Sequence, residues 1–285
     1  MKIFNLKTVV TSALAVAILS GCAISSNKKE TVMKTQEQQA VELIHSIENG
    51  NHEPVAYINP NKYIQHNLAV KDGLAGFGEI MGMLPKGSAR AKVARVFKDG
   101  DYVVTHTTYN FFGPKIGFDI FRFENGKIVE HWDNLQEIVE KTASGRSQID
   151  GPTQIQDIEK TEANKILIKN MLDDVFFGKA PNKITDYIST EKYDQHNPHV
   201  KDGLAGLGEA LKSLAEAKMP MIYEKNHMIL GQGNFVLSVS EGKFMNKHVS
   251  FYDLFRIENG KVVEHWDTIE EIPSSDKWQN QNGKF

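Results

Sequence analysis

Two short motifs, each present twice in this 285-residue sequence, combine histidine with carboxylate or amide side chains. The first is Tyr-x-Gln-His-Asn, which begins at Tyr63 and again at Tyr193. The second is Glu-His-Trp-Asp, which ends at Asp133 and again at Asp267. Imidazole titrates near neutral pH, and a neighbouring carboxylate can take up or return a proton. These residue types therefore suit acid–base chemistry or the orientation of a polar ligand.

The candidate catalytic residues are the histidines and aspartates of these motifs, together with an aspartate on the strand before the second motif: Asp119, His66, His131, Asp133, Asp253, His196, His265 and Asp267. The neighbouring aromatic residues are predicted ligand contacts: Tyr63, Trp132, Tyr193 and Trp266. Structural alternatives remain open for each group. The Tyr-x-Gln-His-Asn histidines could brace the turn that follows, the strand aspartates could hydrogen-bond within the sheet, and the His-Trp-Asp pairs could form an interface network.

Metal and nucleophilic chemistry have less support in the sequence. His66, Asp119 and His131 are suitable ligand types for zinc or iron, but they lie on separate elements without HxxxH or HxH spacing. The sequence has no Gly-x-Ser-x-Gly motif, and its only cysteine is Cys22. We therefore expect no metal and no cofactor.

The two motifs belong to a long internal repeat. Residues 63–79 match residues 193–209 at 13 of 17 positions, and residues 119–133 match residues 253–267 at 12 of 15 positions. A period of this length corresponds to a whole domain, because solenoid repeats span only about 20–50 residues. We predict two tandem domains, a polar linker between them and a short tail, over residues 37–141, 162–274, 142–161 and 275–285, respectively.

Each copy begins with helical patterns and ends with strands. Apolar residues at helical spacing predict helices over residues 37–47, 74–84, 162–177 and 204–217. Runs rich in β-branched and aromatic residues predict strands over 91–97, 102–109 and 115–123. Asn125-Gly126 and Asn259-Gly260 predict two-residue hairpins. The predicted class is α+β, with helices packed on a curved antiparallel sheet in each domain.

The hairpin at Asn125-Gly126 predicts which side chains share a face. In a regular hairpin, Asp119 opposes Trp132 on a largely aromatic face, and His131 and Asp133 lie on the other face. Asp119 would then be a carboxylate among apolar neighbours, which requires a partner or a proton. A single bulge three residues before Asp133 would move His131 and Asp133 to the opposite face.

The order of elements and the two motifs resemble the SnoaL-like branch of the nuclear-transport-factor-2-like superfamily. The resemblance implies a cone-shaped α+β fold with a pocket between the helices and the concave sheet. Polyketide cyclases of this branch use an aspartate as acid and base without metal or cofactor, which here would be Asp119 or Asp133 and, in the second copy, Asp253 or Asp267. Domains of the superfamily pair through their sheets, so we expect an intramolecular pair that resembles a homodimer.

The amino terminus has the pattern of an export signal. Two lysines within residues 1–7 precede an apolar run over residues 8–19, which is too short to cross a bilayer. Leu-Ser-Gly-Cys22 resembles the lipobox of bacterial lipoproteins, which implies removal of residues 1–21, lipidation of Cys22 and a tether over residues 22–36. The expected location is the cell envelope, at the outer membrane facing the periplasm in a bacterium with two membranes.

Composition narrows the classes of partner. The chain has 33 Lys and Arg against 36 Asp and Glu, a formal charge of −3, so we expect no nucleic-acid partner. Two functions remain open. In the first, a membrane-anchored protein binds a small apolar or aromatic, carbonyl-bearing ligand in a pocket of each domain. In the second, each domain is a cofactor-independent cyclase or isomerase that uses aspartate and histidine for proton transfer.

Overall fold

The computed structural model describes residues 33–85 and 87–285. The predicted signal over residues 1–21 and Cys22 lie outside the described residues, as does all of the predicted tether except residues 33–36. Within the described part of the chain, no helix has the length and apolar character needed to span a membrane.

The first domain contains two longer helices, a short 3-10 turn and five strands. The helical segments are α1 (Gln36–Asn49), η1 (Glu53–Tyr57) and α2 (Gly73–Met83). The strands are β1 (Ile64–Gln65), β2 (Arg90–Asp99), β3 (Tyr102–Asn110), β4 (Pro114–Glu124) and β5 (Lys127–Glu137). The sheet order is β1-β5-β4-β3-β2, in which only the β1–β5 pair is parallel.

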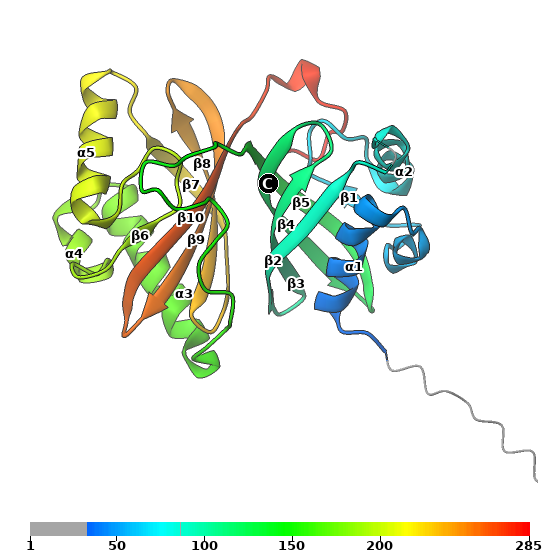
Figure 1. Ribbon diagram of the computed structural model, residues 1–285, viewed down its shortest axis with the longest axis horizontal. Coiled ribbons are helices and arrows are strands. Elements are labelled where there is room, and N and C mark those ends of the chain that lie inside the picture. The colour runs from blue at the N-terminus through cyan, green and yellow to red at the C-terminus, as the bar shows by residue number, and fades with distance from the viewer. Residues whose placement is uncertain (1–32, 86) are drawn as a thin grey trace, which may run out of the picture. The chain divides into compact units, whose positions relative to one another are not determined.

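The second domain repeats this order. Its helical segments are η2 (Ile158–Lys160), α3 (Thr161–Met171), the π-helical turn η3 (Leu172–Phe176), η4 (Pro181–Lys183), α4 (Ile184–Tyr187) and α5 (Gly203–Glu216). Its strands are β6 (Asp194–Gln195), β7 (Ile222–Gln232), β8 (Phe235–Phe244), β9 (Lys247–Glu258) and β10 (Lys261–Glu271), and a last turn, η5, spans Ser275–Lys277. The sheet order is β6-β10-β9-β8-β7 (Figure 1). The predicted α+β class is confirmed.

Local sequence explains where α1 begins and ends. Thr35 and Gln38 form a capping box, in which each side chain accepts a hydrogen bond from the backbone N–H of the other. Gly50 closes the helix at φ 65°, a left-handed conformation that glycine adopts without steric cost. The buried side of α1 packs against the sheet of the first domain through Ala40, Leu43 and Ile44.

Both predicted Asn-Gly hairpins form. Asn125 and Gly126 have φ values of 51° and 74°, and Asn259 and Gly260 have values of 51° and 73°. Positive φ at both central positions is the geometry of a type I′ turn, whose twist matches that of the strands it joins.

The strand that follows each hairpin turn contains a bulge. The pairing predicted for a regular hairpin is therefore wrong beyond the bulge. Ile128 pairs with Phe123 and Glu130 pairs with Arg122, so Val129 has no opposite residue. The same shift leaves Val263 unpaired in β10. Beyond a one-residue bulge, every side chain of the strand moves to the other face.

The bulge brings three polar residues to one face of the first sheet. Asp119 opposes Asp133 rather than Trp132, and His131 opposes Phe121. Trp132 opposes Ile120 on the other face. The predicted interface role of His131 and Asp133 is therefore wrong, because both lie on the face that carries Phe121 and packs beneath α1.

The other face of each sheet contributes to a core shared by the two domains. Phe118, Ile120 and Trp132 lie in one buried cluster with Tyr252, Leu254 and Trp266. Asn134 donates a hydrogen bond to the Thr268 carbonyl over 2.8 Å, and Gln136 accepts one from the backbone N–H of Ile269 over 2.8 Å. Strands β5 and β10 thus contact each other along this face.

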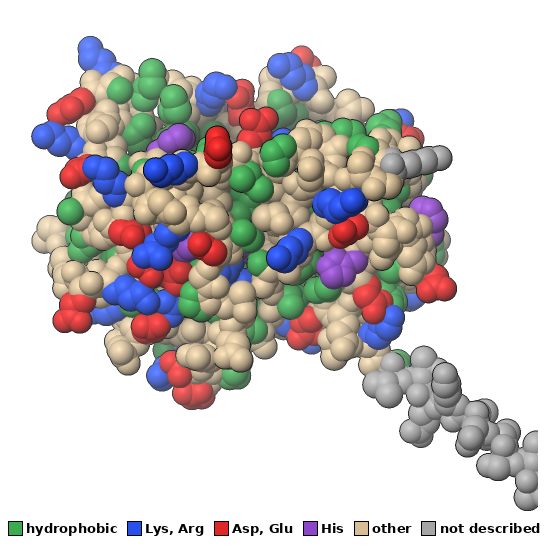
Figure 2. Space-filling model, viewed as in Figure 1, with side chains coloured by type: hydrophobic (Ala, Val, Ile, Leu, Met, Phe, Trp, Pro, Cys, Tyr) green, Lys and Arg blue, Asp and Glu red, His purple; other side chains and the backbone are tan. Residues whose placement is uncertain are grey.

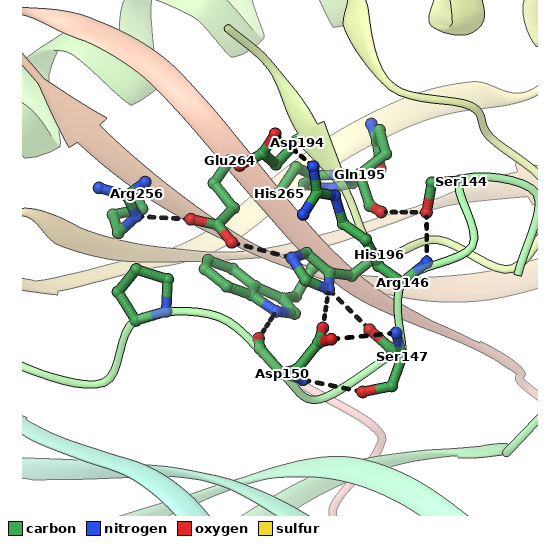
Figure 3. Close-up of polar contacts among 12 residues, drawn as sticks. Ser144, Arg146, Ser147, Asp150, Asp194, Gln195, His196, Arg256, Glu264 and His265 are labelled. Carbon is green, nitrogen blue, oxygen red and sulfur yellow. Dashed lines mark hydrogen bonds and ion pairs between the residues drawn. The ribbon is translucent and has the colours of Figure 1, made fainter.

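The segment that follows each sheet crosses to the opposite domain. After β5, the Ala143 N–H donates to the Pro198 carbonyl, and Ser144 donates to the Gln195 carbonyl (Figure 3). After β10, the Gln279 N–H donates to the Leu68 carbonyl. We call residues 142–150 and 278–285 the linker strap and the tail strap. Each strap covers the Gln-His-Asn loop of the other domain.

Candidate functional site

Asp119, His131 and Asp133 form the candidate site of the first domain. The Nε2 atom of His131 lies 3.2 Å from Asp119 Oδ1. One ligand-type atom from each of the three residues lies within 4.8 Å of the other two. The residues are 7%, 9% and 6% exposed, so they are largely but not fully removed from water.

Each of the three side chains is also held from its outer side. Tyr109 donates its hydroxyl to Asp119 Oδ2 over 2.5 Å. Asn67 donates its amide to Asp133 Oδ2 over 2.6 Å. His131 Nδ1 lies 3.0 Å from Gln65 Oε1. These contacts fix the orientation of the two carboxylates and the imidazole.

The Gln65 contact also assigns the proton on His131. Gln65 Oε1 accepts the backbone N–H of Asn67 over 2.8 Å, which identifies this atom as the amide oxygen. His131 Nδ1 must therefore carry the hydrogen that it shares with Gln65. The Nε2 atom faces Asp119 Oδ1, and the proton between them can belong to the imidazole or to the carboxyl group.

The second domain has the same arrangement in Asp253, His265 and Asp267, whose ligand-type atoms also lie within 4.8 Å of one another. His265 Nε2 lies 3.1 Å from Asp253 Oδ1, and Asn197 donates to Asp267 Oδ2 over 2.6 Å. His265 Nδ1 lies 3.1 Å from Gln195 Oε1. We call the two sets of three residues the first and the second Asp-His-Asp cluster.

Burial and like charge shift the protonation of the second cluster. Burial raises the pKa of Asp267, and the neighbouring Asp253 charge raises it further. Burial alone would lower the pKa of His265, but the hydrogen bond to Asp253 and the charges of Asp267 and Asp253 outweigh it, so the pKa of His265 is raised. Both shifts favour an additional proton or another positive charge in the cluster.

One carboxylate oxygen in each cluster has no hydrogen-bond partner. Asp133 Oδ1 and Asp267 Oδ1 are buried and unpaired within the described structure. Lys284 of the tail strap approaches Asp133 Oδ1 to 3.9 Å, beyond hydrogen-bond distance. Buried polar atoms are usually paired, so these two oxygens are available for a group that binds in the cluster.

His66 and His196, which were predicted as catalytic residues together with Asp119 and Asp253, lie elsewhere. His66 Nε2 lies 3.0 Å from Glu130 Oε1, and its ring stacks on Trp132 with centroids 4.6 Å apart. His196 Nε2 lies 2.9 Å from Glu264 Oε1 (Figure 3). Each Nδ1 atom contacts a carbonyl of the strap that crosses from the other domain, at Gly283 and Ser147. These histidines therefore connect the domains, which corrects their predicted association with the aspartates.

The predicted aromatic contacts separate into two pairs. Trp132 and Trp266 lie in the core shared by the domains, on the opposite sheet face from the clusters, because the bulge moves them there. Tyr63 and Tyr193 lie on the helix side and are 5% and 3% exposed. The Tyr193 ring lies 6.5 Å from that of His265, measured between centroids.

Several residues that hold the clusters were not among the predicted site residues. Gln65, Asn67, Gln195 and Asn197 belong to the repeated Tyr-x-Gln-His-Asn motif, so their identity in both copies was the available signal. Tyr109 on β3 and Tyr223 on β7 each donate a hydroxyl to the aspartate of their own domain. These tyrosines come from different strands of the repeat, so comparison of the copies could not identify them.

A cleft of about 420 Å³ lies beside η3 in the second domain. Leu172 and Phe177 form part of its apolar wall, and Lys169, Lys179 and Lys225 lie at its polar side. The cluster residues are not in its lining. Phe177 packs, however, against the cluster of buried side chains that contains Tyr223, which donates to Asp253. Phe177 thus lines the cleft and also belongs to the hydrophobic packing around Tyr223.

Comparison with known proteins gives structural similarities only. No protein-family model matches the sequence, and no curated protein matches it. An NTF2-like protein from Cytophaga hutchinsonii is 18% identical, with a TM-score of 0.31, over 36% of this chain and 95% of its own. A candidate polyketide cyclase from Bacillus cereus is 17% identical, with a TM-score of 0.30, over 35% and 72%. A candidate ketosteroid isomerase from Kribbella flavida is 14% identical, with a TM-score of 0.32, over 41% and 89%.

Proposed function

We propose that each domain binds a small, largely apolar or aromatic ligand that carries a carbonyl group, with the Asp-His-Asp cluster as the polar end of the site. The observation that carries this proposal is the duplicated cluster with its unpaired Asp133 and Asp267 oxygens. A free carboxylate oxygen can accept a hydrogen bond from a hydroxyl or an acidic C–H beside the carbonyl. Imidazole Nε2, when it carries the shared proton, can donate to the carbonyl oxygen.

The surroundings of the clusters favour an apolar ligand body. Tyr63, Phe121 and Phe77 pack on the helix side of the first sheet. In the second domain, Tyr223 and Phe251 stack with centroids 4.2 Å apart beside Phe176 and Phe177. We infer that the ligand enters the second domain through the cleft beside η3, where Phe177 would have to move aside.

The whole protein would hold these two sites at a membrane through lipidated Cys22. The two domains would form a pair that resembles a homodimer, supported by the shared core and by the crossing of both straps. Figure 2 shows basic and acidic side chains interspersed over the visible face of the described residues. This distribution fits a small-molecule ligand better than an extended polyanion on that face.

Catalysis is the second candidate function, and the Asp119–His131 contact of 3.2 Å favours it specifically. An imidazole oriented by Gln65 and facing a carboxylate can act as a general base on a C–H next to a carbonyl. Tyr109 could then keep Asp119 in place during proton transfer, since it donates to the other oxygen of that carboxylate. This reaction would be a cofactor-independent isomerisation or aldol-type cyclisation.

Ligand binding is tested by thermal unfolding with a panel of aromatic and polycyclic ketones, each paired with its parent hydrocarbon. We expect ketones, and not the hydrocarbons, to raise the Tm of the wild-type protein. Asp119→Asn and Asp253→Asn should weaken binding by about 1–3 kcal/mol each at their own site. If one of these ketones is also turned over, the same substitutions should lower the rate by orders of magnitude.

Asp101→Asn is the matched control, because Asp101 is exposed and distant in the chain from both motifs. It removes the same charge and should leave ketone binding unchanged. Equal loss of binding in Asp101→Asn and Asp119→Asn, or equal stabilisation by ketones and hydrocarbons, would contradict the proposal.

A further inference from the structure

Each Asp-His-Asp cluster brings together three side chains of types that can bind a metal ion. Asp119 Oδ1 and His131 Nε2 face each other at 3.2 Å, and Asp133 Oδ1 has no hydrogen-bond partner. Two carboxylate oxygens and one imidazole nitrogen are suitable ligands for a divalent first-row metal. The three residues come from two adjacent strands and offer atoms within 4.8 Å of one another.

The outer atoms of the same residues are held as metal ligands usually are. A metal-bound histidine commonly donates its other ring N–H to an oxygen acceptor, and bound carboxylates are themselves hydrogen-bonded. His131 donates Nδ1–H to Gln65, whose amide orientation is fixed by the Asn67 N–H. Tyr109 and Asn67 hold the Oδ2 atoms of the two aspartates. Asp119 Oδ1 is thereby left facing His131 Nε2, and Asp133 Oδ1 is left without a hydrogen-bond partner.

The second domain repeats both the three side chains of the cluster and the outer hydrogen bonds that hold them. His265 Nε2 lies 3.1 Å from Asp253 Oδ1, and Asp267 Oδ1 is buried and unpaired. Gln195, Asn197 and Tyr223 supply the outer contacts. In both copies, therefore, the Oδ1 atom of the same aspartate, Asp133 or Asp267, has no hydrogen-bond partner.

Charge supports a cation in these positions. Each cluster places two carboxylates beside one imidazole, largely out of water, where like charges cannot be screened well. Among the described residues, no lysine or arginine forms an ion pair with Asp253 or Asp267. In the first domain, Lys284 lies 3.9 Å from Asp133 Oδ1 and supplies part of the positive charge.

We propose that each Asp-His-Asp cluster binds one divalent first-row metal ion through Asp119, His131 and Asp133 in the first domain and through Asp253, His265 and Asp267 in the second. This departs from the expectation of no metal, which considered His66 and not Asp133 as the third ligand. A bound ion would complete its coordination with water or with a ligand oxygen. The second site should bind more tightly, because Lys284 repels a cation from the first.

Titration of metal-free protein, prepared with a chelator, with Mn²⁺ tests this directly. We expect electron paramagnetic resonance to detect two bound ions per chain with unequal affinities. Asp267→Asn should lower the Mn²⁺ affinity of the tighter site by at least about tenfold, and Asp133→Asn should lower that of the weaker site by a similar factor. Pulsed measurements on the wild-type protein should detect nitrogen coupling from a coordinated imidazole, a readout that does not depend on whether a variant folds.

A surface group of two histidines and a glutamate provides the matched control. His227 and His248 contact Glu241 at 2.9 Å and 2.7 Å, so Mn²⁺ that bound only adventitiously to histidines and carboxylates would bind there instead of at the clusters. His248→Gln should leave two sites intact. The proposal is overturned if wild-type protein binds no Mn²⁺ more tightly than about 1 mM, if both cluster variants retain two sites, or if His248→Gln abolishes binding.

The metal proposal and the proposed ligand function can fail separately. The ketone panel is measured on chelator-treated protein, and the Mn²⁺ titration is measured without ketone. Ketone binding without Mn²⁺ binding would refute only the metal site. Mn²⁺ binding at both clusters without any ketone response would refute only the ligand class.

Discussion

His66 shows how a residue suited to catalysis can instead join two domains. It is 5% exposed, its two ring nitrogens contact Glu130 and the Gly283 carbonyl, and its ring stacks on Trp132. Glu130 also accepts from Arg122 over 2.6 Å. This network lies on the opposite sheet face from Asp119, so His66 cannot exchange a proton with the cluster directly.

We predict that His66→Ala destabilises the protein and leaves ketone affinity at the clusters within about twofold. Loss of both ring contacts and of the stacking should cost about 1–3 kcal/mol in the free energy of unfolding, since Glu130 and the half-buried Gly283 carbonyl each lose a partner. Urea unfolding measures this cost. His52→Ala changes an exposed histidine and should have little effect. A stable His66→Ala protein that no longer binds ketones would restore His66 to the site.

The two straps stabilise loops of the domain opposite to the one they follow. Each strap covers a Gln-His-Asn loop and forms polar contacts with it. In the linker strap, Arg146 Nη2 lies 2.8 Å from Asp194 Oδ1 (Figure 3). The same atom lies 3.1 Å from Asp202 Oδ2. In the tail strap, Asn282 takes the place of the arginine. Its side-chain amide donates a hydrogen bond to Asp72, the counterpart of Asp202, over 2.8 Å. The first domain thus replaces an ion pair by a neutral donor.

We predict that Arg146→Ala lowers stability in a pH-dependent way. Burial alone would raise the pKa of Asp202, but the hydrogen bonds from Arg146 and the Gln195 N–H and the Arg146 charge lower it below the ordinary value of 3.8. A lowered folded-state pKa stabilises the fold above the unfolded pKa, and the effect disappears as pH falls through the folded value. The half-exposed pair should contribute only about 0.5–1 kcal/mol at pH 7.

Thermal unfolding of wild type and Arg146→Ala between pH 7 and pH 2 provides the measurement. The difference in Tm should be largest near neutral pH and should shrink as Asp202 takes up a proton. Lys212→Ala removes an exposed cation of the same domain and should show no such narrowing. A wild-type advantage that grows toward low pH would contradict the assignment.

At the scale of the molecule, attachment to a membrane is expected to depend on one residue. Cys22 ends the Leu-Ser-Gly-Cys sequence, and the described residues include no membrane-spanning helix. We predict that Cys22→Ser moves the protein from the detergent phase to the aqueous phase in detergent partitioning of cells. Ser26→Ala, in the expected tether, is the control and should stay with the detergent. Detergent partitioning that is unchanged in Cys22→Ser would point to another membrane contact.

The main helices and hairpins, and the residue types of the sites, can be predicted from the amino-acid sequence alone. The repeat predicts two similar units, Asn-Gly predicts the hairpins, and residue types identify the aspartates and histidines as the ionisable groups of interest. These features follow from local preferences, since turn geometry and helix capping depend on a few neighbouring residues. The Gln and Asn that hold the clusters were also visible as repeated motif positions.

Which of these residues come into contact depends on how the strands pair and how the two sheets pack. Both faces of β5 are buried, one beneath α1 and the other in the shared core, so alternation of apolar and polar residues could not reveal the bulge at Val129. That bulge moves Asp133 to Asp119 and Trp132 away from it. The crossing of the straps, which places His66 between the domains, depends on contacts more than 200 residues apart in the chain. Local sequence does not encode such contacts, because they form only when the two sheets pack together.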